Sequence, residues 1–338
     1  MSEPELRVCL HESELDAALR FDARLGLTSD PKHLPMRLHY DGRGAALFGE
    51  LTRQPEYYLT RCERQILASH ADEIAEVLAT ESGTGGFESP MGAPVSVVEL
   101  GAGAAEKIRV VLDALNRDGL LESFWPFDVD AGSVREVIAE LGRAYPDIRL
   151  GGIIGDFTVH LQHLPDDHHT RLVAFLGGTF GNFRSMERGQ FLRDLRDALR
   201  PGDWFMVGAD LVKDPEVLLA AYNDAAGVTA EFDRNVLHVL NHRLGGDFEP
   251  ENFEHLALWD EDATTIEMRL RALKPMEVDL PALGLSIAFA AGEEVHTGVS
   301  VKFHAEELED QLRAAGFRPE HRWSDPGGRF GVFLARVA

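Results

Sequence analysis

The feature that most constrains the fold of this chain is a regular alternation of short apolar runs and amphipathic segments between residues 94 and 210. The runs are rich in β-branched and aromatic residues, which favours buried strands, and the segments between them have the apolar spacing of helices. The predicted strands are 94–100, 124–129, 148–154, 172–176 and 204–210, with helices at 104–115, 133–144 and 186–199. Strands that alternate with helices form βαβ units, so we expect an α/β fold with a doubly wound parallel sheet.

The alternation stops at Asp210, and the sequence after it has a different character. The first ninety residues predict helices and loops, ending in a Gly/Ser/Pro-rich loop at 81–94. The pattern after Asp210 predicts a helix at 215–225, hairpin-like strands at 264–273, 285–290 and 299–303, a helix at 305–315 and a closing pair of strands that ends with 330–337. A chain of 338 residues, at roughly 100–200 residues per domain, is expected to form two domains. We expect a sheet domain from 61–211 with 301–338, and a second α+β domain from 1–60 with 212–300.

The charge balance is strongly acidic, with 57 Asp and Glu against 33 Lys and Arg and a formal net charge of -24. Such a surface repels nucleic-acid phosphates and anionic lipid headgroups, so we expect neither nucleic acid nor a membrane surface as a partner. The two cysteines, Cys9 and Cys62, form no CxxC pair, which is typical of a reducing compartment. The N-terminus lacks the apolar core of a signal peptide, and no apolar run approaches the ~18–20 residues of a membrane span. We therefore expect a cytoplasmic protein.

The sequence VVELGAG, residues 97–103, joins the first strand of the alternating region to a helix. Gly101 and Gly103 allow a nucleotide-like ligand to approach the backbone, although a strand-to-helix turn also uses glycine for its own geometry. A dinucleotide-binding turn requires a third small residue at the position of Glu106, whose charge would repel a pyrophosphate. The motif thus favours a nucleoside-type ligand, and a dinucleotide oxidoreductase is the less favoured enzyme class.

Acidic and aromatic residues follow the next two predicted strands. Asp128 ends the second strand, where a carboxylate accepts both hydroxyls of a ribose, and Asp156 with Phe157 offers an acceptor and an aromatic face to an adenine. Each aspartate alone is equally compatible with the cap of a helix. Because the carboxyl ends of parallel strands meet at one edge of the sheet, their combination with the glycine turn predicts a nucleoside cofactor.

Eight segments of the chain closely resemble the histidine-specific Nα-methyltransferases of ergothioneine biosynthesis. They are PEYYLTRCE (55–63), ELGAGAAEK (99–107), PFDVDAG (126–132), GDF (155–157), FLGGTFGN (175–182), PGDWFMVGADLVKD (201–214), AYNDAAGVTAEFDRNVL (221–237) and FAAGEEVHTGVSVKF (289–303). The resemblance spans nearly the whole chain. It implies a class I S-adenosylmethionine-dependent methyltransferase with a Rossmann-like sheet and a substrate-binding second domain. It also implies methylation of the α-amino nitrogen of free L-histidine, up to three times, to give hercynine.

Matched position by position, the resemblance assigns cofactor and substrate to different residues. The cofactor residues are Gly101, Gly103, Lys107, Asp128, Asp156 and Phe157. The amino acid's carboxylate and amine fall to Tyr57, Gly177, Asn182 and Tyr222, and its side-chain end falls to Met268 and Ser300. Tyr40 matches a tyrosine near the reacting amine. Tyr40 and Tyr57 are therefore the catalytic candidates, as orienters of the amine or as proton acceptors through water. A catalytically silent nucleoside-binding protein is the alternative, and the intact amine-binding set argues against it.

The chain departs from the family at Gly298, where the family has an acidic residue that binds the imidazole N–H. Loss of a charged acceptor for a buried N–H costs about 1.5–3 kcal/mol. Glycine also leaves room for a larger side chain, so the alternative substrate is another aromatic or a modified amino acid. Glu293, Glu294 or a water held by Ser300 are the candidates to replace the missing acceptor.

The segment 160–169 contains four histidines and two aspartates, which raises the question of a metal. Their spacing matches no zinc signature, so we expect a polar loop and no metal. The resemblance and the like-charge repulsion of an acidic chain favour a monomer whose partner is a small amino-acid substrate.

Overall fold

The computed structural model describes residues 4–81 and 94–338, so the loop expected at 81–94 lies almost wholly outside the described residues. The chain divides into two compact units. Unit 1 contains Met1–Leu10, Arg61–Leu211 and Phe303–Ala338, and unit 2 contains His11–Thr60 and Val212–Lys302. Each of the two segments of unit 2 is therefore preceded and followed along the chain by residues of unit 1.

Unit 1 contains an eight-stranded sheet within the described residues, in the order β1-β5-β4-β3-β6-β7-β14-β13. The strands are β1 (Glu5–Val8), β3 (Val95–Leu100), β4 (Leu121–Asp128), β5 (Arg149–Ile154), β6 (Thr170–Phe175), β7 (Trp204–Asp210), β13 (Phe317–Ser324) and β14 (Phe330–Val337). Neighbouring strands from β1 to β7 run parallel, whereas β14 pairs antiparallel with both β7 and β13. This confirms the expected Rossmann-like, doubly wound sheet. The chain order reverses between β3 and β6, and ligands of such sheets bind beyond the carboxyl ends of the strands at this point.

The central strands are buried on both faces, which explains their continuous apolar composition. Every residue of β3 and β7 is buried. The helices of this unit are α3 (Leu59–Glu81), α4 (Arg109–Arg117), α5 (Ala131–Ala144), α6 (Ser185–Ala198) and α9 (Ala305–Ala314), with short 3-10 helices η2 (Leu161–His163) and η3 (Thr179–Asn182). Helix α4 begins at Arg109 and not at 104 as predicted. Gly101, Gly103 and Ala105 have φ angles of 64°, 50° and 51°, so the chain forms turns there before the helix can start.

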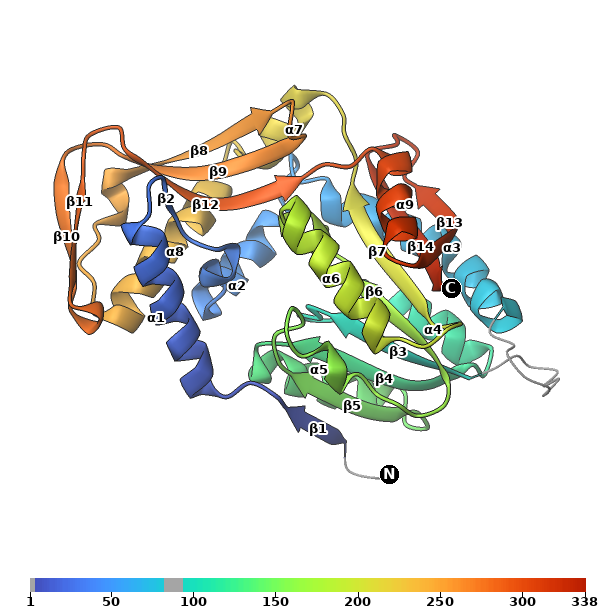
Figure 1. Ribbon diagram of the computed structural model, residues 1–338. Coiled ribbons are helices and arrows are strands. Elements are labelled where there is room, and N and C mark those ends of the chain that lie inside the picture. The colour runs from blue at the N-terminus through green and yellow to red at the C-terminus, as the bar shows by residue number, and fades with distance from the viewer. Residues whose placement is uncertain (1–3, 82–93) are drawn as a thin grey trace. The chain divides into compact units, whose positions relative to one another are not determined.

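The first ten residues differ from the domain boundaries expected from the sequence. Strand β1 pairs parallel with β5, with Glu5 opposite Gly151, and Figure 1 shows it at the edge of the sheet. These residues therefore lie in unit 1, whereas the expected second domain began at residue 1. The strand is short and mostly exposed, so it has no apolar pattern that could indicate it.

Unit 2 combines helices with mainly antiparallel strands. Its elements are α1 (Glu12–Thr28), β2 (Lys32–His33), η1 (Met36–His39), α2 (Gly42–Leu51), α7 (Pro215–Ala221), α8 (Val228–Leu244), η4 (Pro250–Asn252), β8 (Phe253–Asp260), β9 (Thr265–Ala272), β10 (Met276–Leu280), η5 (Pro281–Leu283), β11 (Leu285–Phe289) and β12 (Glu294–Val301). One sheet has the order β2-β12-β9-β8, and β10 pairs with β11. Figure 1 shows α8 lying along the four-stranded sheet. Their shared core includes Leu27 of α1, Val236 and Leu240 of α8, and Leu270 of β9.

Two predicted elements of unit 2 have different bounds in the structure. The helix predicted at 215–225 ends at Ala221. Strand β12 begins at Glu294, five residues before the predicted strand, and its pairing with β9 has an irregularity between His296 and Gly298.

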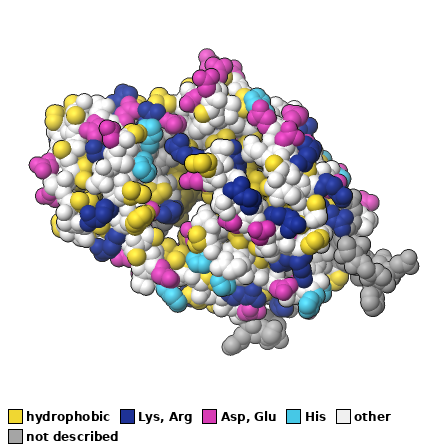
Figure 2. All heavy atoms as spheres, viewed as in Figure 1, with side chains coloured by type: hydrophobic (Ala, Val, Ile, Leu, Met, Phe, Trp, Pro, Cys, Tyr) yellow, Lys and Arg dark blue, Asp and Glu magenta, His cyan; other side chains and the backbone are white. Residues whose placement is uncertain are grey.

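The surface agrees with the mixed composition of the chain. Acidic and basic side chains are interspersed on the face that Figure 2 shows. No helix in the described part of the chain is long and apolar enough to cross a membrane.

Candidate active site

The glycine turn after β3 and the carboxylate at the end of β4 are joined directly in unit 1. The backbone N–H of Gly103 donates to Asp128 Oδ2 at 3.1 Å, and the N–H of Asp130 donates to Oδ1 at 3.0 Å. A Cβ atom placed on Gly103 would meet nothing within 4 Å, so open space lies beside this backbone. Burial raises the pKa of Asp128, although the N–H groups of Asp130 and Gly103 act in the opposite direction. The turn thus presents a half-buried carboxylate next to open backbone.

The third predicted pair, Asp156 and Phe157, lies beside the same turn. A Cβ atom on Gly101 would lie 3.6 Å from Phe157 Cε1. Asp156 Oδ1 accepts from the N–H and hydroxyl of Thr158, at 2.8 and 2.6 Å, which leaves Oδ2 without a donor among the described residues. The Phe157 ring packs edge-on against Phe175, with ring centres 5.1 Å apart, and remains half-buried. One oxygen of Asp156 therefore caps the turn at Thr158, while the other remains available as an acceptor.

Glu63 of α3 binds residues that follow strands β3 and β6 at the same edge of the sheet. The sequence analysis did not identify it as a site residue. Its side chain is fully buried and accepts from Lys107 Nζ at 2.9 Å. Both of its oxygens also lie 2.9 Å from the backbone N–H of Gly177. A Cβ atom on Gly208 would lie 1.9 Å from Glu63 Oε1, so β7 needs glycine at this position. Glu63 could have been identified from the sequence because it is an acidic residue on the otherwise apolar face of α3.

Glu99, the acidic residue of the VVELGAG motif, is buried in β3. Its Oε2 atom has no hydrogen-bond partner within the described chain. Its pKa is raised to about 8, mainly by burial; the charge of Lys107 acts to lower it, and the charges of Glu63 and Asp128 act to raise it. A buried acceptor without a donor is costly, so this position is suited to a bound group that carries an N–H or O–H.

The remaining predicted residues of unit 1 follow β6. Gly177 has a φ of 90°, and a Cβ atom there would lie 2.8 Å from Lys107 Nζ. Asn182 ends η3 and is half-buried. Both therefore lie beyond the carboxyl end of β6, at the reversal of the strand order.

Unit 2 brings the three predicted tyrosines into one aromatic cluster. Phe48 lies between Tyr40 and Tyr57, with ring centres 5.8 and 6.3 Å away, and Tyr57 lies edge-on to Tyr222 at 6.4 Å. Phe232 of α8 packs against Tyr40 at 5.5 Å and completes the cluster. Tyr57 and Tyr222 are buried, whereas Tyr40 is about half exposed. These aromatic faces suit a cationic amine.

The hydroxyl groups of Tyr222 and Ser300 share a buried lysine. Their oxygen atoms are 2.7 Å apart, and Lys302 Nζ donates to each at 2.8 Å. The Lys302 ammonium also lies 4.4 Å from the centre of the Tyr222 ring. Because Lys302 donates to both oxygens and one hydroxyl donates to the other, the second hydroxyl proton is available for an acceptor on a ligand. Lys302 was missed by the sequence analysis, although it lies two residues after Ser300, just beyond the end of β12.

The space above Gly298 is filled by two methionines. A Cβ atom on Gly298 would lie 2.5 Å from Met36 Cε and 2.6 Å from Met268 Cε. Gly298 and Met268 are opposite each other in the pairing of β12 with β9. The expectation that glycine leaves room for a larger side chain is therefore wrong for this structure, because methyl groups of Met36 and Met268 already take that room. Met36 was not among the predicted residues.

The two glutamates that were candidates to replace the missing acidic residue both form ion pairs within the protein, so neither carboxylate is free to bind a ligand. Glu293 pairs with Lys32, whose hydrogen bond lowers the pKa of Glu293. Glu294 accepts from Arg269 at 2.7 Å and Arg271 at 2.7 Å, and these contacts lower its pKa as well. Both carboxylates thus hold strands of unit 2 together.

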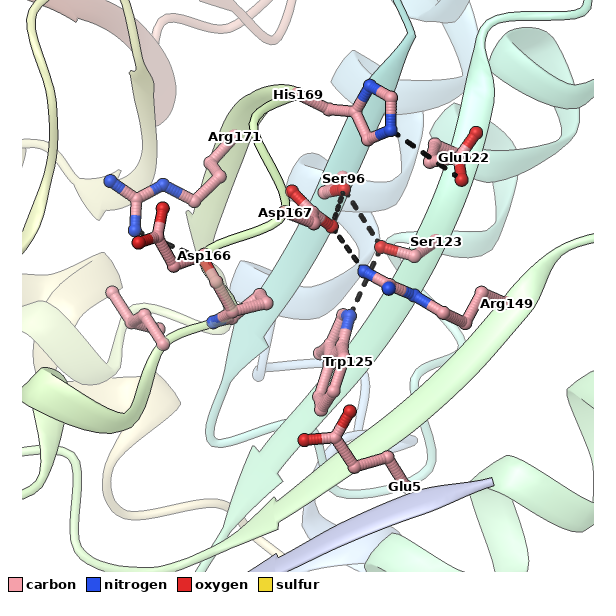
Figure 3. Close-up of polar contacts among 12 residues, drawn as sticks. Glu5, Ser96, Glu122, Ser123, Trp125, Arg149, Asp166, Asp167, His169 and Arg171 are labelled. Atoms are coloured by element: carbon pink, nitrogen blue, oxygen red, sulfur yellow. Dashed lines mark hydrogen bonds and ion pairs between the residues drawn. The ribbon is translucent and has the colours of Figure 1, made fainter. Parts of the chain in front are cut away.

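The histidine-rich segment of unit 1 is part of a polar network at the opposite, amino ends of the strands. Figure 3 shows Asp167 pointing toward Ser96 and Arg149, at 2.6 and 2.5 Å, while Ser123 links Ser96 to Trp125. Within residues 4–81 and 94–338, no group of three or more His, Cys, Asp or Glu side chains is placed to hold a metal ion. The segment therefore anchors a loop to the sheet.

Comparison with known proteins shows which protein family has a sequence similar to this chain. A family model described as "Histidine-specific methyltransferase, SAM-dependent" matches residues 19–337. The chain is 47% identical to "Histidine N-alpha-methyltransferase" of Mycolicibacterium smegmatis and 42% identical to the protein of the same name from Mycobacterium tuberculosis, in each case over 94% of both chains. It is also 28% identical to "Ergothioneine biosynthesis protein 1" of Neurospora crassa, over 90% of this chain and 33% of that protein.

Proposed function

Because the chain belongs to the family of histidine-specific, S-adenosylmethionine-dependent methyltransferases, we propose that it methylates the α-amino nitrogen of free L-histidine. Three successive transfers would give the trimethylammonium betaine hercynine, an intermediate of ergothioneine biosynthesis. The observation that carries this proposal is the likeness to two histidine N-alpha-methyltransferases along nearly the full length of the chain.

The residues at the carboxyl edge of the unit 1 sheet fit S-adenosylmethionine. The cofactor offers ribose hydroxyls, an adenine amino group and an ammonium as donors. The edge offers as acceptors the carboxylates of Asp128 and Asp156 and the unpartnered carboxyl oxygen of Glu99. The orphaned oxygen of Glu99 and the open space beside Gly103 are the two features that a bound group would complete. When bound, the cofactor supplies an electrophilic methyl group on a cationic sulfonium. We therefore assign the cofactor to Gly101, Gly103, Lys107, Asp128, Asp156 and Phe157.

The amino acid's carboxylate and amine are assigned by the likeness to the family, residue by residue. The matched residues are Gly177, Asn182, Tyr57 and Tyr222. The ammonium must lose a proton before its lone pair can attack, and removal from water beside a cation lowers its pKa in that direction. Tyr40 and Tyr57 would orient the amine or take its proton through water. The aromatic cluster would stabilise the positive charge that grows with each methyl group.

The side-chain end of the amino acid is assigned to Met268, Gly298 and Ser300. Met36 and Met268 close the space above Gly298, which argues against a substrate larger than histidine. The hydroxyl pair of Ser300 and Tyr222, supported by Lys302, can donate one proton to the unprotonated nitrogen of a neutral imidazole. Recognition of the imidazole through an acceptor nitrogen thus needs no acidic residue at position 298.

We further propose that the protein acts as a monomer in the cytoplasm, with unit 1 binding the cofactor and unit 2 most of the substrate. The net charge of -24 supports the first point, because it disfavours association of like-charged copies. Light scattering coupled to gel filtration would measure the mass in solution, and a dimer would contradict this assignment.

The test of the proposed activity is incubation with S-adenosylmethionine and a panel of free L-amino acids, read by mass spectrometry. We expect histidine to gain the mass of three methyl groups, with mono- and dimethylated species appearing first. The Asp128→Ala variant is the matched control for background methylation. If another amino acid is methylated and histidine is not, the substrate assignment fails. If no amino acid is methylated, the proposed function fails.

A further inference from the structure

A chain of buried side chains runs through unit 2 beneath the aromatic cluster. Asp233 of α8 lies between two histidines: its Oδ1 is 3.1 Å from His39 Nε2, and its Oδ2 is 2.7 Å from His255 Nδ1. The relative exposures of His39, Asp233 and His255 are 0%, 0% and 7%. We call these residues the His–Asp–His triad.

The outer nitrogens of both histidines face backbone carbonyls. His39 Nδ1 lies 2.9 Å from the carbonyl oxygen of Met36, and His255 Nε2 lies 2.9 Å from that of Tyr222. A carbonyl has no proton to give, so these two nitrogens must each carry one. The two inner contacts with Asp233 also need one proton each, because a bare nitrogen facing a carboxylate oxygen would be repelled in a buried site.

The triad therefore holds four protons, which gives it a net charge of +1. The four contacts place these protons on the ring nitrogens, and the electrostatics of Asp233 and His255 agree with this placement. Burial acts to raise the pKa of Asp233, but hydrogen bonds from His255 and His39 outweigh it and hold that pKa well below its usual range. Burial acts to lower the pKa of His255, but the hydrogen bond and charge of Asp233 raise it above its ordinary value. The opposing charge on His255 comes from Arg234 of α8.

The triad connects three residues that the proposed function assigns to the amino-acid site or its wall. Met36, which closes the space above Gly298, is bound to His39 of the triad through its carbonyl oxygen. Tyr40 directly follows His39 in the chain. Tyr222 is bound through its carbonyl from the other end of the triad. The His39 ring also stacks on Phe232 at 5.2 Å, which supports the base of the aromatic cluster.

A second contact from α8 fixes the same segment. Asn235 Nδ2 donates to the carbonyl of His39 at 2.9 Å and to Asp41 Oδ1 at 2.8 Å, while Arg43 donates to Asn235 Oδ1 at 2.7 Å. A Cβ atom on Gly44 would lie 1.8 Å from the His39 carbonyl oxygen, so the chain is tightly packed here. Asp41 and Arg43 are the charged groups that contact Asn235 from the α2 side.

We propose that Asp233 is a positioning residue, and that the protonated His–Asp–His triad sets the placement of Met36, Tyr40 and Tyr222 in the amino-acid site. The proposal rests on the proposed function for the roles of these three residues. It predicts that the affinity for the amino acid depends on the four protons of the triad. Loss of one proton at high pH would break one of the four contacts and release the 36–40 segment or the Tyr222 backbone.

Nitrogen-15 NMR of the full-length protein with labelled histidine tests the protonation directly. At neutral pH we expect both ring nitrogens of His39 and both of His255 to carry protons, with assignments from His39→Gln and His255→Gln. A bare nitrogen on either ring at neutral pH would overturn the proposal. This measurement does not depend on the proposed function, so it stands even if no amino acid is methylated.

Asp233→Asn tests the positioning role. The amide still forms hydrogen bonds but cannot raise the pKa of His255, so the affinity for histidine should be lost at a lower pH. We expect the midpoint of that loss, measured by calorimetry with S-adenosylhomocysteine present, to move down by about one pH unit or more. The titration of the ligand's own amine is common to both proteins and cancels in the comparison.

The matched control is Asn241→Ala on the same helix, where Asn241 exchanges two hydrogen bonds with the backbone of Phe248. We expect this variant to lower the melting temperature without moving the pH midpoint. If Asp233→Asn also lowers the melting temperature but keeps the wild-type midpoint, the triad is structural only and the proposal is wrong.

Discussion

Restoring the family's acidic residue with Gly298→Glu tests how the side-chain end of the site is built. The new Cβ atom would lie 2.5 Å from Met36 Cε and 2.6 Å from Met268 Cε, so both methionine side chains must move. The obstructing atoms are the far ends of flexible side chains, so the substitution is costly but compatible with folding.

The expected magnitude follows from two opposing contributions. A charged acceptor for a buried imidazole N–H contributes about 1.5–3 kcal/mol. Extra atoms in a packed site cost about 1–3 kcal/mol. The two nearly cancel, so Gly298→Glu alone should change the KM for histidine by no more than about threefold.

Reducing the obstruction separates the two contributions. Met36→Ala removes one of the two obstructing methyl groups, so in that background only the Met268 side chain must move to admit the glutamate. We expect the double variant to have a KM about tenfold or more below that of Met36→Ala. The assay is the rate of S-adenosylhomocysteine formation at saturating cofactor, with melting temperatures to check the fold.

Two results would refute this reasoning. A tenfold lower KM for Gly298→Glu alone would mean that Met36 and Met268 do not obstruct position 298. An unchanged KM in the Met36→Ala background would mean that the imidazole does not lie near Gly298.

Two further predictions concern the cofactor edge of unit 1. Asp128→Ala should abolish S-adenosylmethionine binding in calorimetry, whereas Asp130→Ala, which removes the cap of α5, should cost about 1 kcal/mol of stability and retain binding; normal binding by Asp128→Ala would contradict the assignment. Because burial raises the pKa of Glu99 to about 8 from 4.5, the folded protein keeps a proton that the unfolded chain releases at lower pH. The free energy of unfolding contributed by this group is therefore full below about pH 4.5 and declines as the pH rises toward about 8. Urea unfolding should show a weaker decline for Glu99→Gln, and equal slopes in both proteins would refute the raised pKa.

The sequence predicted the sheet of unit 1 well because its central strands are buried on both faces. Continuous runs such as those of β3 and β7 leave few other interpretations. Helix α4 began later than predicted because propensity does not report the positive φ of Ala105. Strand β1 was missed because its stability comes from pairing with β5, far along the chain, and not from its own composition.

The candidate site was predictable where neighbouring strand ends define it. The contact of Gly103 with Asp128 follows from the parallel sheet and the glycine turn. Glu63, Lys302 and Met36 were not predictable in the same way, because each reaches the site from an element whose position depends on tertiary packing. Local patterns show which face of a helix or strand is apolar, but not which distant glycine leaves space for a carboxylate or a thioether.

The position of β1 also orders the steps by which this protein can fold during synthesis. Residues 5–8 are made well before their partner strand β5, which ends at Ile154 and follows the first segment of unit 2. Unit 2 cannot be completed before Lys302 is made, and the unit 1 sheet cannot be completed before β14. All of unit 2 has therefore been made while β7 still lacks its partner β14, and the nascent chain keeps an unpaired strand edge at β7 until β14 is made.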